Sequence, residues 1–127
     1  MSERVFDHID QHVRSLEAAK PFYDAFLKNF GFRKMPSRDE AIVYVRIIDR
    51  VVHEAFAVIV DSAHVPGQSC LGFRAGSPAD VDRIAATLEA AGAREIEGPV
   101  LCPEYTLDYY AVFFKDPDGN RLEVAYR

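Results

Sequence analysis

The chain has 127 residues, of which 49% are hydrophobic, and its formal net charge is −5. This size and composition predict a globular protein built as one domain, or as two small half-domains that share a core. Lys and Arg form no basic run, which argues against nucleic acid or an anionic membrane as a partner, and no segment approaches the ~20 apolar residues of a membrane-spanning helix.

The first half of the sequence predicts a strand, a helix and three further strands. Residues 5–13 form the first strand, and Ser15 then precedes an amphipathic run that Gly31 closes as a helix-ending residue. Pro21 lies inside this run, so the helix is expected to kink there or to start there. The three short strands that follow are expected at 32–35, 41–47 and 52–60.

The second half follows the same order of elements. A strand at 69–75 leads to Ser77 and Pro78, which are suited to cap and open a helix that Gly92 ends. Strands are then expected at 94–97, 109–115 and 121–126. The loop between the first two of these, 98–108, is the longest irregular stretch; it would close over a site or contact a second subunit.

The spacing of helix boundaries indicates an internal repeat. The helix-opening residues Ser15 and Ser77 lie 62 positions apart, and the helix-ending residues Gly31 and Gly92 lie 61 positions apart. Each half reads strand–helix–strand–strand–strand and is too small to bury its own sheet alone. We therefore expect a single domain of two modules, at about 4–62 and 68–127.

Alternation along the strands predicts which side chains face away from the helices. A helix covers one face of its sheet, which leaves His8 on the first strand, Cys70 on the fifth and Glu123 on the last strand on the uncovered faces. The 62-residue offset carries His8 onto Cys70. If the two sheets curl around a cleft, the three side chains point into it together.

These features together resemble the vicinal oxygen chelate superfamily, which includes glyoxalase I, extradiol dioxygenases, fosfomycin resistance proteins and bleomycin-binding proteins. The resemblance rests on Phe6-Asp7-His8-Ile9, Ser15-Leu16-Glu17, Phe22-Tyr23, Phe30-Gly31-Phe32, CLGFRAGSPADV and YYAVFFKDPDGNRLEVAY. It implies an α+β fold of two βαβββ modules in tandem that form a U-shaped, mostly antiparallel sheet around a metal site.

The resemblance also implies a set of metal ligands. It assigns His8 and Glu123 as ligands, and it places Cys70 where the family has a second histidine. Glu54 and Asp61 are the acids near the strand that supplies a further carboxylate in some members. Imidazole and carboxylate suit Fe, Mn, Ni or Zn, whereas a thiolate favours Zn and lowers the Lewis acidity of the ion, which argues against ring-cleaving dioxygenase activity.

Each candidate also has an ordinary structural interpretation. His8 would be a hydrogen-bonded strand histidine, Cys70 a small buried side chain, and Glu123 a solvated carboxylate. No spacing marks the remaining histidines, which are expected in loops or in solvent, although a shifted metal site could recruit one of them: His12, His53 and His64.

Further side chains are expected to line the site and contact a substrate. These are Tyr44 and Arg46 on the third strand, Arg74 on the fifth, and Tyr110, or its neighbour Tyr109, on the seventh. An arginine there would hold a carboxylate or phosphate group. The competing interpretation is that both arginines are surface residues paired with acids.

Three functions follow from these alternatives. The first is a metal-dependent lyase, isomerase or transferase that acts on a small substrate with adjacent oxygens, with Glu123 as the catalytic residue. The second is a metal-free protein that binds a small molecule, as bleomycin-resistance proteins do. The third is a dimer whose site has decayed and holds no metal.

A homodimer is implied by the resemblance. The polar start MSERVFDH and the unpaired thiols of Cys70 and Cys102 predict a cytoplasmic location.

Overall fold

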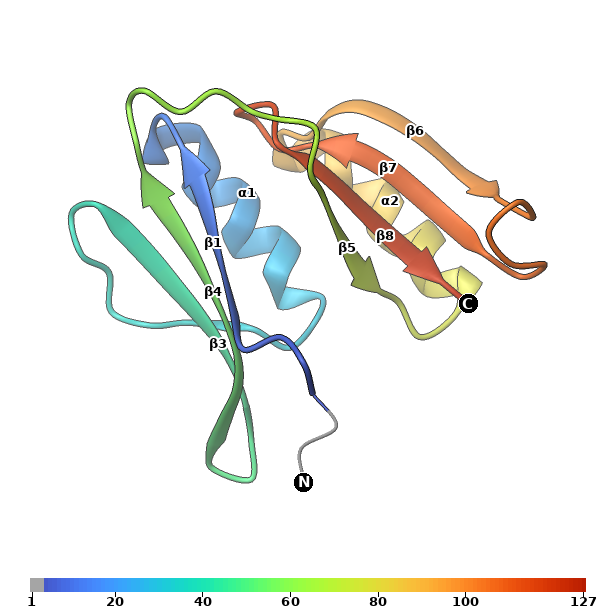
Figure 1. The fold of residues 1–127 in the computed structure, drawn as a ribbon, viewed down its shortest axis with the longest axis horizontal. Coiled ribbons are helices and arrows are strands. Elements are labelled where there is room, and N and C mark those ends of the chain that lie inside the picture. The colour runs from blue at the N-terminus through green and yellow to red at the C-terminus, as the bar shows by residue number, and fades with distance from the viewer. Residues whose placement is uncertain (1–3) are drawn as a thin grey trace. The chain divides into compact units, whose positions relative to one another are not determined.

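A computed structural model describes residues 4–127. The chain divides into two compact units, the first of which ends at His64 while the second begins at Val65. Each unit contains one helix and one four-stranded sheet (Figure 1). We refer to them as the first and second modules.

The first module has the predicted βαβββ order of elements. These are β1 (His8–Val13), α1 (Leu16–Lys28), β2 (Arg33–Lys34), β3 (Ala41–Ile48) and β4 (Val51–Val60). The strand order in the sheet is β1-β4-β3-β2; β1 is parallel to β4, and the other two pairs are antiparallel.

The second module repeats this arrangement. Its elements are β5 (Cys70–Arg74), α2 (Pro78–Ala91), β6 (Arg94–Leu101), β7 (Tyr110–Lys115) and β8 (Arg121–Tyr126). The strand order is β5-β8-β7-β6, again with one parallel pair, β5 with β8, and two antiparallel pairs. The predicted α+β fold of two tandem βαβββ modules with mostly antiparallel pairing is therefore confirmed.

Both helices begin at the predicted serine caps. The Ser15 hydroxyl accepts the backbone N–H of Glu17 at 3.2 Å, and the Ser77 hydroxyl accepts that of Asp80 at 3.1 Å. These bonds satisfy backbone donors that a helix N-terminus otherwise leaves unpaired. Helix α1 begins at Leu16 and continues through Pro21, so the late start at Pro21 is wrong.

The two helices end differently. Gly92 has a φ of 103° and ends α2 as a left-handed cap, as predicted. Helix α1 instead ends at Lys28 with Asn29 as its cap. An additional turn follows, and the N–H of Gly31 (φ 84°), at its end, donates to the Lys28 carbonyl. Gly31 therefore marks the exit from that turn and not the helix cap.

Each helix covers one face of its own sheet with apolar side chains. In the first module the Tyr23 and Phe56 rings lie 5.5 Å apart between α1 and β4, and both side chains are buried. In the second module the α2 stripe is Val81, Ile84 and Leu88, each at most 1% exposed. Burial of one such side chain contributes about 1.5–3 kcal/mol to folding. We call the opposite side of each sheet its uncovered face.

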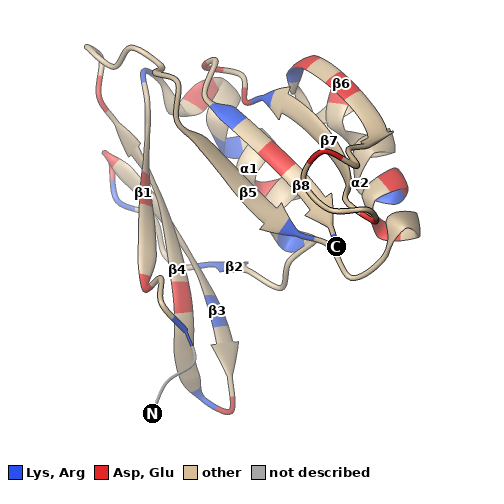
Figure 2. Ribbon diagram, turned by 45° about the vertical axis from the view of Figure 1, so that its right-hand side comes forward, with Lys and Arg blue, Asp and Glu red and all other residues tan. Residues whose placement is uncertain are grey.

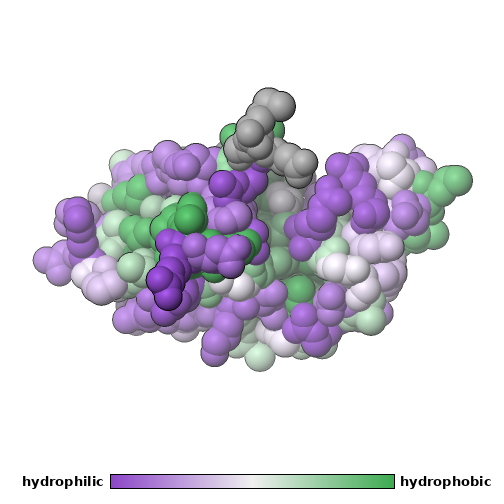
Figure 3. Space-filling model, turned by 90° about the horizontal axis from the view of Figure 1, so that it is seen from below, coloured by the Kyte–Doolittle hydropathy of each residue, from purple (hydrophilic) through white to green (hydrophobic). Residues whose placement is uncertain are grey.

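Within residues 4–127, acidic and basic residues are interspersed over the strands and helices (Figure 2). The surface seen from below is largely polar but carries separate apolar patches (Figure 3). Exposed apolar side chains of the β3–β4 hairpin are Ile47, Ile48, Val51 and Val52. Within residues 4–127, neither helix is long and apolar enough to cross a membrane.

Candidate functional site

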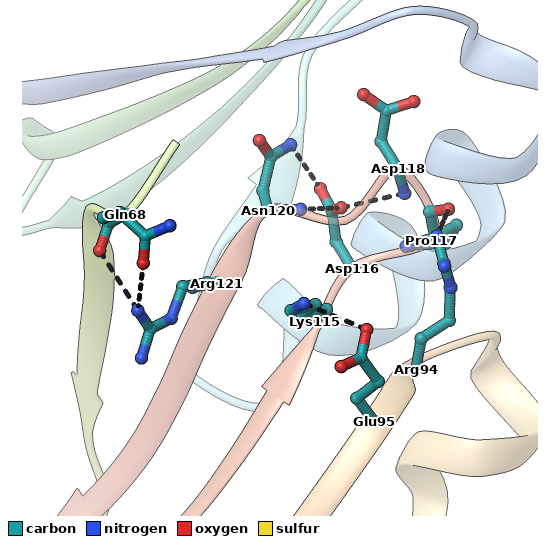
Figure 4. Close-up of polar contacts among 9 residues, drawn as sticks. All are labelled: Gln68, Arg94, Glu95, Lys115, Asp116, Pro117, Asp118, Asn120 and Arg121. Atoms are coloured by element: carbon teal, nitrogen blue, oxygen red, sulfur yellow. Dashed lines mark hydrogen bonds and ion pairs between the residues drawn. The ribbon is translucent and has the colours of Figure 1, made fainter. Parts of the chain in front are cut away.

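The turn DPDGN sets the start of β8. Asp116 is fully buried, and its Oδ1 accepts the backbone N–H groups of Asp118 and Asn120, both at 2.9 Å (Figure 4). Its Oδ2 accepts the Asn120 side-chain amide at 2.8 Å. Gly119, at φ 103°, adopts the left-handed conformation that closes the turn, and its N–H donates to the Asp116 carbonyl.

This turn fixes the orientation of Glu123. Leu122 and Val124 are at most 1% exposed and lie under α2. Glu123, between them, points to the uncovered face because side chains alternate along a strand. Register pairs Glu123 with Gly72 and Arg121 with Cys70, so Glu123 and Cys70 share that face on neighbouring strands. The predicted orientation of both residues is confirmed.

A tyrosine holds the Glu123 carboxylate. The Tyr109 hydroxyl donates a hydrogen bond to Glu123 Oε2. Partial burial, followed by this bond, raises the pKa of Tyr109 to about 12. The Tyr105 ring lies edge-on to the Tyr109 ring at 5.0 Å, and the Arg127 guanidinium lies over it at 5.6 Å. The Glu123 carboxylate is thus bonded to the Tyr109 phenol, whose ring in turn contacts a second phenol ring and a cation.

Arg127 was not among the sequence candidates. Side chains alternate along a strand, so the pattern of β8, continued from Glu123 through Ala125, would have placed Arg127 on the same face. Tyr105 belongs to the 98–108 loop, which was expected to close over a site or to contact a second subunit, and its ring lies against the Tyr109 ring.

The thiol of Cys70 is not activated. Partial desolvation and the negative charge of Glu123 raise its pKa, and the nearby Arg121 only partly opposes them. A thiol binds metal as the thiolate, so Cys70 must lose a proton that its surroundings retain. Of the three predicted ligands, it has the environment least suited to a metal.

Two predicted substrate-binding residues on β3 lie on the other side of the sheet. Tyr44 is 2% exposed, and its hydroxyl donates to Asp24 on α1 at 2.8 Å. Arg46 lies on the same side and pairs with Glu54 on β4 at 2.5 Å. The expected orientation toward the uncovered face is wrong for both. Strand β3 is apolar on both faces, so alternation did not distinguish them.

The remaining two substrate candidates, Tyr110 and Arg74, lie on opposite faces of the second sheet. Tyr110 lies on the α2 side of its sheet, where its hydroxyl donates to Asp82 on α2 at 2.6 Å. Its expected orientation is also wrong, and the neighbouring Tyr109 takes that place. Arg74 is exposed and pairs in register with Ala125, two residues beyond Glu123. Arg74 therefore shares the uncovered face of Glu123, as predicted.

In the first module, His8 lies on the uncovered face at the start of β1. Its Nδ1 lies 2.9 Å from Asp7 Oδ2, and its side chain is 58% exposed. The hydrogen bond that the imidazole donates to Asp7, followed by the charge of Asp10, raises the pKa of His8. A metal would have to bind the other ring nitrogen, Nε2.

A different group of ligand atoms lies at the far end of β1. His12, Asp61 and His64 place one potential ligand atom each within 4.8 Å of one another. The hydrogen bond from His12, and then the backbone N–H of Ala63, lower the pKa of Asp61. Of the acids considered from the sequence, Asp61 thus bonds His12 and lies near His64, whereas Glu54 pairs with Arg46.

The family assignment follows from the module pattern together with a sequence comparison. The sequence model of the Glyoxalase/Bleomycin resistance protein/Dioxygenase superfamily matches residues 5–124, nearly the whole chain. The chain belongs to this superfamily. The match spans both modules, from the strand that carries His8 to the strand that carries Glu123.

Similar proteins agree with the assignment. The chain is 27% identical to the uncharacterized protein YqjT of Bacillus subtilis, over 93% of this chain and 95% of YqjT. A glyoxalase/bleomycin resistance protein from Albidiferax ferrireducens T118 superposes with a TM-score of 0.76 at 28% identity, over 96% and 98% of the two chains. A lactoylglutathione lyase from Agrobacterium tumefaciens has the same fold, with a TM-score of 0.69, 21% identity, and coverage of 99% and 95%.

Proposed function

We propose that this member of the glyoxalase superfamily is a metal-dependent enzyme, a lyase, isomerase or transferase, that acts on a small substrate with two adjacent oxygen atoms. The supporting observation is that both assigned ligands, His8 and Glu123, are held through one atom and keep a second donor atom for a metal. Asp7 contacts Nδ1 of His8, and Tyr109 donates to Oε2 of Glu123. Hydrogen bonds of this kind usually orient metal ligands in proteins.

Each residue of this site has an assigned role. We assign His8, through Nε2, and Glu123, through Oε1, as the residues that would hold the ion, and Asp7 and Tyr109 would set their orientation. A divalent ion held by these residues would supply the Lewis acidity that carbonyl chemistry on adjacent oxygens needs. Glu123 is the residue to which we assign the catalytic role. Arg74 is suited to hold an acidic group of the substrate, because it is exposed on the same face.

A metal-free binding function is the second candidate, and Cys70 favours it. The raised pKa of this thiol disfavours the thiolate that would complete a three-ligand set. Without a metal, the phenol rings of Tyr105 and Tyr109 and the Arg127 cation form a surface suited to a flat or acidic ligand.

Metal analysis separates the two functions. Purified protein is reconstituted in turn with Zn, Mn, Ni and Fe(II), and bound metal is measured for the wild type, His8→Ala and Glu123→Gln. His53→Ala is the control, because His53 lies on β4 outside the assigned ligands. The enzyme model predicts that His8→Ala and Glu123→Gln each lose the same equivalent of metal. Equal metal content in all four proteins would rule the model out.

We also propose a homodimer. The exposed apolar side chains of the β3–β4 hairpin, including Val51 and Val52 at 54% exposure each, supply surface that association would bury. Sedimentation velocity on the wild type and on Val51→Lys tests this. A wild-type protein that sediments as a monomer at high micromolar concentration would contradict the proposal.

A further inference from the structure

We infer that His12, Asp61 and His64 form a second metal site, suited to Zn(II), at the end of β1 in the first module. It is separate from the His8 and Glu123 site of the proposed function, and none of its three ligands belongs to that site.

The backbone brings the three side chains to one place. Strands β1 and β4 are parallel, with His12 opposite Ile59 and Val13 opposite Val60. The Asp61 N–H donates to the Val13 carbonyl at 2.8 Å, which extends this pairing by one step. Because side chains alternate along a strand, Asp61 points to the same face as Ile59 and His12.

A turn then returns His64 to the same place. The His64 N–H donates to the Asp61 carbonyl at 2.9 Å, and the Ala63 N–H donates to Asp61 Oδ1 at 3.1 Å. The turn brings the ring centroids of His12 and His64 to 6.0 Å. The bond from Ala63 occupies Oδ1 and leaves Oδ2 directed toward His12, the arrangement expected of a carboxylate that binds metal through one oxygen.

The separation of two ligand atoms matches a tetrahedral ion. His12 Nδ1 lies 3.3 Å from Asp61 Oδ2. Two ligands bound at about 2.0–2.1 Å and at the tetrahedral angle lie roughly 3.3 Å apart. A charge-assisted hydrogen bond is usually shorter, about 2.7–2.9 Å. The observed distance is therefore long for a charge-assisted hydrogen bond and matches the spacing of two ligands of one zinc ion.

His64 is the ligand that must approach. Its ligand atom lies within 4.8 Å of the other two, so it moves by up to roughly 1.5 Å to reach the tetrahedral spacing. It lies outside the strands, at the end of the turn, where a small adjustment disturbs no sheet pairing.

The chemical types of the three ligands determine which class of metal ion the site prefers. Two imidazoles and one carboxylate suit Zn(II), or Co(II) in its place, whereas Ca²⁺ and Mg²⁺ prefer oxygen ligands alone. The side chains of His12 and Asp61 are 44% and 42% exposed, so water can reach the fourth position. A bound ion would fasten the end of β1 to residues 61–64.

The experiment uses the full chain carrying His8→Ala and Glu123→Gln, which removes the ligands of the proposed function. Zn(II) binding is measured by calorimetry, and Co(II) binding by the visible absorption of a tetrahedral complex. We expect one equivalent of Zn(II), an affinity at least 10-fold lower when His64→Ala is added, and a change below twofold when His53→Ala is added instead. No Zn(II) binding in the parent, or an unchanged affinity after His64→Ala, would overturn the inference.

A separate measurement controls for an effect of the substitutions on folding. The melting temperature without metal is expected to be the same in the parent and the His64→Ala protein, because His64 lies at the end of a surface turn. Added Zn(II) should raise the melting temperature of the parent only. Asp61→Asn, which keeps an oxygen for the Ala63 N–H, is a second ligand variant and should lose the same shift. A Zn(II)-induced shift that survives both substitutions would place the ion elsewhere. Failure of the proposed function shows as the same number of metal equivalents in the wild type and in the parent, whereas failure of the inference shows as a parent that binds no Zn(II).

Discussion

Replacing Asp116 by alanine tests whether the buried turn carboxylate sets the last strand. The substitution leaves three donors without their acceptor: the backbone N–H groups of Asp118 and Asn120 and the Asn120 amide. A hydrogen bond to a charged group contributes about 1.5–3 kcal/mol, and such contributions are not additive. Asp116 is 0% and Asn120 7% exposed, so water replaces the lost acceptor poorly. We expect Asp116→Ala to lower the free energy of unfolding by about 3–5 kcal/mol.

The assay is urea unfolding followed by circular dichroism, with the slope compared between variants to show that the same surface is exposed. Asp116→Asn retains the oxygen that accepts both backbone groups and should cost less, about 1–2 kcal/mol. Asp108→Ala is the matched control: its carboxylate is exposed and accepts the Thr106 hydroxyl at 3.3 Å, so a change within about 0.5 kcal/mol is expected. A loss below about 1 kcal/mol for Asp116→Ala would refute the argument.

Three further predictions concern single side chains. Tyr44→Phe removes the hydrogen bond to Asp24 and should lower the free energy of unfolding in urea by about 1–2 kcal/mol. The loss is not larger because water can partly replace the tyrosine at Asp24. An unchanged midpoint would show that the buried hydroxyl contributes nothing. Tyr109 should ionise near pH 12 by ultraviolet absorption, and Glu123→Gln should lower that pKa. Because folding raises the pKa of Tyr109, its contribution to stability is present below the ordinary tyrosine pKa and is lost as pH rises through about 12. Alkylation of Cys70 should show a pH midpoint above that of the unfolded chain, and Glu123→Gln should move it down; a midpoint below the unfolded value would contradict the assigned surroundings.

Local signals in the sequence predicted the fold well where a residue type has one strong conformational role. The serine caps and Gly92 act through a single turn of backbone, so their positions identified the start of both helices and the end of α2. Strand β6 is the exception. It extends to Leu101, four residues beyond its expected end, and takes up Gly98 and Pro99, residues that normally indicate a loop. Antiparallel pairing with β7, interrupted by register shifts, overrides that local preference.

Orientation was predictable only on strands with a clear polar and apolar alternation. Strand β8 alternates, so the faces of Glu123 and Val124 followed directly. Strand β3 does not alternate. Two adjacent tyrosines, Tyr109 and Tyr110, stand at the start of β7, and which of them faces α2 depends on a register that the sequence does not encode locally. The candidate group His12, Asp61 and His64 was missed because His12 lies 49 positions before Asp61 and meets it only through a strand pairing, while a turn after Asp61 brings His64 to the same place.

The geometry of β1 explains why a metal at either end of this strand can be tested independently. His8 and His12 lie four residues apart on the same face, which separates their Cα atoms by about 13 Å at ~3.3 Å per residue. Two ligands of one zinc ion lie roughly 3.3 Å apart, and an imidazole extends too short a distance to close that gap. One ion therefore cannot use both histidines. Each histidine also has its own carboxylate neighbour, Asp7 for His8 and Asp61 for His12. Loss of metal on His8→Ala with retention on His64→Ala, or the reverse, consequently assigns a bound ion to one end of the strand.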